Sequence, residues 1–115
     1  MMPVSPQVLH AESPSGTGTQ SATINFDGEW EIIAISLKNN NNVDGLFEKS
    51  EIFYYSQRDG GGKPIQLAAG YTGGDVIPLN VVHTFILVGS CSIVAFINHI
   101  TATTHAIDIL ARKIS

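Results

Sequence analysis

The sequence predicts an all-β fold: an antiparallel β-sandwich, jelly-roll-like, with an extended N-terminal arm. Three observations favour it. The 14 Ile and 8 Val residues outnumber the 7 Leu residues, and β-branched side chains suit strands. Short alternating segments are separated by clusters of Gly, Asn, Asp and Pro. No long helical pattern lies between them to supply the crossovers of a parallel sheet. An immunoglobulin-like sandwich is the alternative, and 115 residues make one domain.

The first 20 residues are expected to form a flexible arm ahead of a sandwich domain at residues 21–115. Three prolines and two glycines fall within residues 3–18, a density that sustains neither a helix nor a central strand. The alternative is an arm that orders on a neighbouring subunit. Val4, Val8 and Leu9 are then the apolar residues it would bury against that partner.

The first expected strands lie on either side of Asp27-Gly28, a turn signal. Residues 23–26 alternate weakly before it. Residues 30–37 (WEIIAISL) follow it, with Ile33, Ile35 and Leu37 on one face and further apolar residues on the other. Because both faces are mostly apolar, this strand is expected to lie in the interior of the fold.

A polar loop and a hairpin are expected next. Four consecutive asparagines, residues 39–42, favour a turn. Residues 50–57 (SEIFYYSQ) and 63–70 (KPIQLAAG) are expected to pair through the Asp-Gly signal of residues 58–63. A Gly-rich loop also binds phosphate when it runs into a helix, but Pro64 and a strand-like segment follow here.

The later part of the chain is expected to add a short edge segment and three strands. Each alternates apolar and small or polar residues, and Gly89-Ser90 forms a turn between two of them. The expected ranges are residues 76–79, 82–88, 91–98 and 103–110.

Charge is distributed very unevenly along the chain. Eleven of the sixteen charged residues fall between Asp27 and Lys63, and Asp75 is the sole one among residues 64–107. The surface of a small domain normally carries charge. We therefore expect part of the outer face of the later strands to be buried against another chain, as in a homo-oligomer or a subunit of a larger assembly.

Composition argues against nucleic-acid and membrane partners. The net charge is −4 and the six basic residues are scattered, whereas nucleic-acid binders present a basic face. The most apolar stretch, residues 85–100, is short for a bilayer and interrupted by polar residues. The N-terminus lacks the features of a signal peptide. Cys91 lies in an apolar run and is expected in the core.

No pattern of catalytic or metal-binding residues stands out, so we expect no enzyme, no metal and no cofactor. His99 and His105 flank a short connection that could bring them together, with Asp108 as the nearest carboxylate, but zinc requires three or four ligands. Glu29 and Glu31 are the one adjacent acidic pair of the kind a glycosidase uses. No Gly-x-Ser-x-Gly motif occurs.

Carbohydrate binding is the alternative function, as in a lectin-like or receptor-binding fibre module. Such sandwiches bind glycans through exposed aromatic side chains and loop amides. Trp30, Tyr54 and Tyr55 lie in expected strands, where they would pack in the core. Tyr71, in a Gly-rich loop, is the best exposed candidate.

The chain resembles the decoration, or cement, proteins of tailed-phage capsids and related jelly-roll virion modules. The resemblance covers about residues 21–115, through the segments GEWEIIAISL, SEIFYYSQRDGGG and HTFILVGSCSIVAFIN, with the arm before them. It implies a structural protein of the virion, made in the host cytoplasm, that sits as a homotrimer on the capsid surface and binds the major capsid protein. It transfers no catalytic residue.

Overall fold

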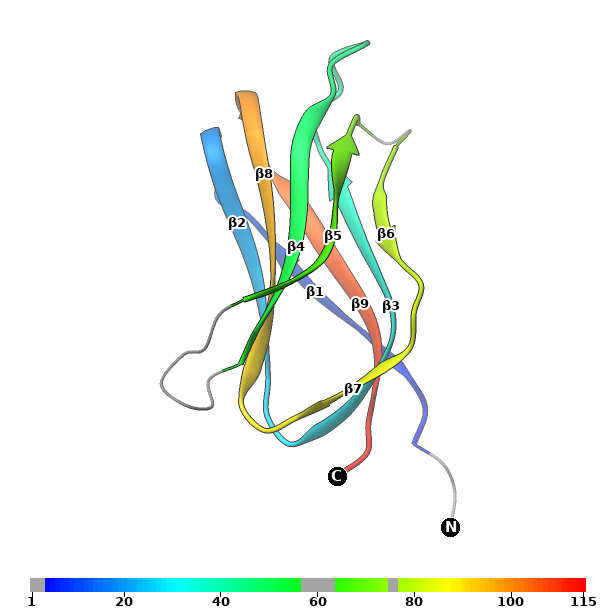
Figure 1. Ribbon diagram of the computed structural model, residues 1–115. Helices are drawn as coiled ribbons and strands as arrows, with labels where there is room; N and C mark the ends of the chain where they lie inside the picture. The colour runs from blue at the N-terminus through cyan, green and yellow to red at the C-terminus, as the bar shows by residue number, and fades with distance from the viewer. Residues whose placement is uncertain (1–3, 57–63, 75–76) are drawn as a thin grey trace.

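In a computed structural model, which describes residues 4–56, 64–74 and 77–115, the chain is an all-β sandwich (Figure 1). Antiparallel pairing joins the strands of two packed sheets, which confirms the predicted antiparallel β-sandwich. The nine strands of the described ranges are β1 (Gln7–Glu12), β2 (Gly16–Phe26), β3 (Glu29–Asn39), β4 (Glu48–Ser56), β5 (Ile65–Thr72), β6 (Leu79–Val81), β7 (Phe85–Val88), β8 (Cys91–Thr103) and β9 (His105–Lys113).

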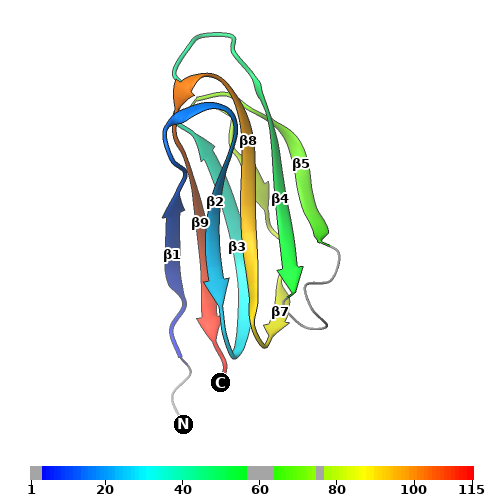
Figure 2. The ribbon, with the colours of Figure 1, turned by 90° about the vertical axis from the view of Figure 1, so that its left-hand side faces the viewer.

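The strands pair in a nested order. The first sheet runs β1-β9-β3-β6, with β7 also on β3, and the second runs β2-β8-β4-β5. The first strand thus pairs with the last, the second with the next to last, and so on inward to the β4–β5 hairpin. This is not the immunoglobulin order, in which the first, second, fifth and fourth strands share a sheet. Figure 2 shows the two sheets face to face, with both chain ends at the same end of the sandwich.

The expected N-terminal arm is wrong over residues 7–20. Strand β1 pairs with β9 from Gln7 opposite Ala111 to Glu12 opposite Ala106, and β2 begins at Gly16 against β8. The sandwich therefore begins about 14 residues before the predicted boundary at residue 21. Pro6 and Pro14 flank β1 and do not interrupt it, so the prolines of this segment lie outside the two ends of an edge strand.

The core lies between the sheets and is built from alternate residues of the central strands. Strand β8 points Cys91, Ile93, Ala95 and Ile97 inward, as its alternation predicted, and all are at most 2% exposed. In β3 an irregularity between Ile32 and Ala34 shifts the register against β9. As a result Ile32, and not Ile33, shares the buried side with Ile35 and Leu37, so the prediction that Ile33 lies on one face with these two residues is wrong.

Several expected elements differ in length or fall where the structure is not described. The β4–β5 pairing confirms the predicted hairpin, while its loop at residues 57–63 lies outside the described residues, as do Asp75 and Val76. The late segments shorten to β6 and β7. Strand β8 extends to Thr103, so the turn before β9 is a single residue, Thr104.

Candidate functional site

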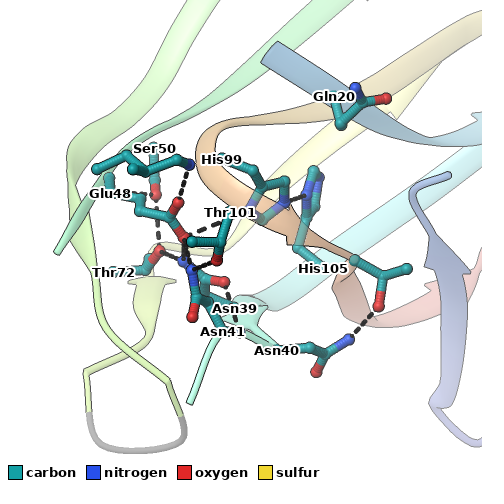
Figure 3. Close-up of polar contacts among 12 residues, drawn as sticks. Gln20, Asn39, Asn40, Asn41, Glu48, Ser50, Thr72, His99, Thr101 and His105 are labelled. Carbon is teal, nitrogen blue, oxygen red and sulfur yellow. Dashed lines mark hydrogen bonds and ion pairs between the residues drawn. The ribbon is translucent and has the colours of Figure 1, made fainter. Parts of the chain in front are cut away.

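A cluster of buried polar side chains closes one end of the sandwich; we call it the buried carboxylate network (Figure 3). At its centre the side chains of Glu48 and His99 have no exposed area. Its members come from β3, β4, β5, β8, β9 and the loop after β3. They are Asn39, Asn41, Glu48, Thr72, His99 and His105.

The Glu48 carboxylate accepts every hydrogen bond that it makes in this network. Its Oε1 receives Asn39 Nδ2 at 2.8 Å, Asn41 Nδ2 at 3.2 Å and His99 Nδ1 at 3.3 Å. Its Oε2 receives the backbone N–H of Ile100. Burial acts to raise the pKa of this carboxyl, but the hydrogen bonds outweigh burial and hold the pKa below its ordinary value. Glu48 is therefore a buried anion stabilised by donors.

The two histidines extend the network across the interior, as the short connection between them suggested. His99 Nε2 lies 2.9 Å from His105 Nδ1, and His105 Nε2 lies 3.4 Å from the carbonyl of Ala95. Burial, followed by the neighbouring His99 ring, lowers the pKa of His105 to about 4. His105 is thus neutral near pH 7, and a neutral imidazole has one donor and one acceptor nitrogen.

The amide side chains join this network to the rest of the sandwich. Asn39 Nδ2 also donates to Thr72 Oγ1 at 3.1 Å, and Asn41 Nδ2 donates to Thr101 Oγ1 at 2.8 Å. The backbone N–H of Asn41 donates to Asn39 Oδ1 at 2.9 Å. Two of the four asparagines predicted as a polar loop are thus buried, because Glu48 supplies a buried acceptor for their amides.

The network has the geometry of a structural element. With no exposed area on Glu48 or His99, a substrate in solution does not reach them. Asp108, the carboxylate expected near the histidines, points to the opposite face of β9 and accepts from His10 Nδ1 at 2.6 Å. That hydrogen bond raises the pKa of His10. Within the described residues, no group of three or more His, Cys, Asp or Glu is placed to hold a metal ion.

Other candidate residues are separated from the network. Cys91 is 2% exposed and burial raises the pKa of its thiol, as expected of a core cysteine. Glu31 forms an ion pair with Arg112 at 3.5 Å on the outer face of β3. Tyr71 is 63% exposed but lies in β5, not in a loop.

The outer face of the first sheet carries exposed apolar residues. Val8, Leu110 and Ala34 lie side by side across β1, β9 and β3, and with Val82 they border a shallow hollow of about 200 Å³. Ile86 shares this side, because it is opposite Glu31 in β3. Val82 is 75% exposed and Val8 63%. We call Val8, Ala34, Val82, Ile86 and Leu110 the apolar face.

The outer face of the second sheet carries three partly exposed aromatic rings, which we call the aromatic face: Phe53, Tyr55 and Phe96. The ring centres of Phe53 and Phe96 are 5.7 Å apart, and those of Phe53 and Tyr55 are 6.3 Å apart. Ser21 of β2 lies opposite Phe96 in the ladder. Alternation in the sequence places Phe53 and Tyr55 on one face of β4, whereas the contact of Phe53 with Phe96 depends on the pairing of β4 with β8.

Comparison with protein families, with curated proteins and with solved structures found no match to this chain. The fold and the surfaces described above are therefore the basis for a function. Over the described ranges, no helix has the length and apolar character needed to span a bilayer.

The four residues predicted to bind a partner do not lie together in the structure. Val8 belongs to the apolar face, and Leu9, its neighbour in β1, packs against the core. Val4 is exposed ahead of β1, and Tyr71 lies on the other sheet. Sequence reasoning missed Val82 and Ile86, whose signal was the absence of charge in residues 64–107.

Proposed function

We propose that this protein is a non-enzymatic structural protein of a virion. It self-associates, and the oligomer binds and stabilises a large protein assembly, the capsid. The observation that carries the proposal is the apolar face. Val82 and Val8 border the hollow of that face together with Ala34 and Leu110, Ile86 lies on the same outer side of the sheet, and the three are each at least 50% exposed. Exposed apolar side chains gathered on one face are typical of an interaction site.

The fold and the charge pattern support the same proposal. The nested strand order supports a double-sheet jelly roll, an architecture that occurs in viral capsid and lectin domains. Asp75 is the sole charged residue of the range 64–107, and among the described residues of that range seven large apolar side chains are at least 40% exposed. Burying these side chains against another protein contributes about 25 cal/mol of favourable free energy per Å² of apolar surface removed from water. Binding only the assembled form would stabilise that form by mass action.

The experiment makes the same substitution at two exposed valines. Val82→Glu puts a carboxylate on the apolar face, and Val43→Glu is the matched control, because Val43 is 54% exposed in the loop after β3, outside that face. Sedimentation velocity should show self-association of the unaltered chain, weakened at least tenfold by Val82→Glu and unchanged by Val43→Glu. A monodisperse monomer at the highest attainable concentration would contradict self-association. Absence of the chain from purified particles would contradict the virion role.

A second candidate function, binding of neutral glycans, is favoured by the aromatic face. Its three rings are bordered by the hydroxyls of Ser21 and Thr23 on the neighbouring strand. Aromatic rings flanked by a few polar groups are typical of ligand sites. Titration with neutral oligosaccharides should show binding that Phe96→Ala abolishes. Phe47→Ala, which removes an exposed ring outside this face, is the control, and unaltered binding in Phe96→Ala would exclude the site.

A further inference from the structure

The sandwich has edge strands that differ sharply in how they are protected against pairing with another chain. An edge strand presents unpaired backbone N–H and C=O groups, and proteins limit them with charge, proline, bulges or short length. Strand β1 carries Glu12 and is flanked by prolines, and β6 has three residues directly after Pro78. Strand β5 follows Pro64, and its ladder with β4 has an irregularity between Ile52 and Phe53.

Strand β2 lacks these protections over most of its length. It lies at the free edge of the second sheet, with β8 on its other side (Figure 1). Its register with β8 shifts between Gly16 and Gly18 and is then regular from Thr19 to Phe26. That regular stretch, TQSATINF, contains no charged residue and no proline. Its outward side chains, among them Ser21 and Thr23, are small, polar and exposed.

We propose that β2 is the contact through which two copies of this chain pair, edge to edge and antiparallel, around a two-fold axis at Ala22. Opposed residues in an antiparallel ladder must point to the same face, so the axis passes through a residue and not between two. An axis at Ala22 keeps the ladder within the regular stretch: residues 19–25 of one copy pair with residues 25–19 of the other, so that Thr19 is opposite Asn25 and Ala22 is opposite Ala22.

This register is self-complementary in its side chains. On the outer face Ser21 lies opposite Thr23 of the second copy, and Thr19 lies opposite Asn25, each pair occurring twice. Cross-strand hydroxyl pairs of this kind stabilise antiparallel sheets. On the inner side Ala22 meets its own copy, and no like charges are brought together. A second copy is therefore the occupant that this edge fits, and the two four-stranded sheets would become one sheet of eight strands.

The inference rests on the proposed function only for the statement that the chain self-associates; it adds the surface and the register. A two-fold contact closes on itself and gives a dimer. The trimer that the phage resemblance implies would have to form through another surface, such as the apolar face.

The test uses two double variants of the full chain that differ by one charge sign. In the proposed register, the variant Ser21→Lys with Thr23→Lys places lysine opposite lysine at both copies of the Ser21–Thr23 pair. The variant Ser21→Lys with Thr23→Glu places lysine opposite glutamate at the same two pairs. Both positions are exposed in the single chain, so both variants should fold alike. The dimer dissociation constant from sedimentation equilibrium should rise about tenfold or more for the first and stay near the unaltered value for the second.

Cysteine cross-linking tests the register. Opposed residues in a ladder have Cα atoms about 4.5 to 5.5 Å apart, within disulfide range. An oxidised equimolar mixture of Ser21→Cys and Thr23→Cys chains should therefore form a covalent dimer that neither chain forms alone. The native Cys91 is buried and stays out of the reaction. Efficient self-cross-linking of Ser21→Cys alone would overturn the Ala22 axis.

The outcomes separate this inference from the proposed function. Dimers unaffected by the lysine pair but lost in Val82→Glu overturn the edge contact and keep the apolar face. Dimers lost in the lysine pair and kept in the lysine–glutamate variant support the edge contact. A chain that is monomeric at all concentrations overturns both.

Discussion

Four donors from two strands and a loop converge on the Glu48 carboxylate. A buried carboxylate is stable only when its oxygens are hydrogen-bonded, since an isolated buried charge costs several kcal/mol. Here the donors outweigh burial, because the pKa of Glu48 is lowered. The Glu48 carboxylate, on β4, thus links β3 and β8 to its own strand inside the sandwich.

Replacing Glu48 with glutamine should destabilise the protein by about 2 to 4 kcal/mol, because an NH₂ group would face N–H donors in a buried site. Chemical denaturation of Glu48→Gln measures this directly. Glu51→Gln is the matched control on the same strand. Its carboxylate is partly exposed and accepts a hydrogen bond from Gln66, so its cost should stay within about 0.5 kcal/mol. Equal costs for the two variants would contradict the role assigned to Glu48.

His105 should make the folded state sensitive to mild acid. Its folded pKa of about 4 is below the ordinary value of 6.5, so between these values the unfolded chain binds more protons. Titration of His105 leaves the free energy of unfolding unchanged above pH 6.5. As the pH falls from 6.5 towards 4, the free energy of unfolding decreases, by about 2 to 3 kcal/mol near pH 4.5.

Unfolding free energies of the unaltered chain and of His105→Gln, measured from pH 7 to pH 4.5, test this prediction. The glutamine keeps a polar side chain at the site and does not titrate. The free energy of the unaltered chain should fall more steeply with acid than that of the variant, and parallel curves would show that His105 does not carry the effect.

At the scale of the elements, alternation in the sequence predicted the inner row of β8 because both neighbours of a central strand enforce the period of two. Three features depend on tertiary partners that alternation does not reveal. Strand β1 exists because β9 pairs with it. The register shift at Ile32 is set against β9. Asn39 and Asn41 are buried because Glu48 lies beside them. The candidate site was anticipated only in the closeness of His99 and His105.

Strand β1 allows the structural and the binding roles of the N-terminal segment to be separated. Leu9 packs against the core, whereas Val8, the next residue, is 63% exposed on the apolar face. Leu9→Ala should lower the free energy of unfolding by about 1 to 2 kcal/mol. Val8→Ala should change it by less than about 0.5 kcal/mol and instead weaken self-association in sedimentation velocity. Loss of stability in Val8→Ala of the same size as in Leu9→Ala would contradict this division.

At the scale of the whole molecule, two modes of self-association are available, and they act on different parts of the backbone. The apolar face offers side chains whose own strands are already paired within the first sheet. The β2 edge offers backbone groups that have no partner strand on their outer side. The two modes can operate together, because the apolar face and β2 belong to different sheets.

Native-state hydrogen exchange at low and high protein concentration distinguishes the two modes. In the monomer, exchange should be slowest in β3, β4, β8 and β9, the strands with a partner on each side. Edge pairing would add hydrogen bonds to alternate N–H groups of residues 19–25, and those amides should become protected as the concentration rises. Contact through the apolar face buries side chains over β1, β9 and β3 without adding a backbone bond to β2. Unchanged exchange in β2, in a sample shown to be dimeric, would therefore assign the dimer to a surface other than this edge.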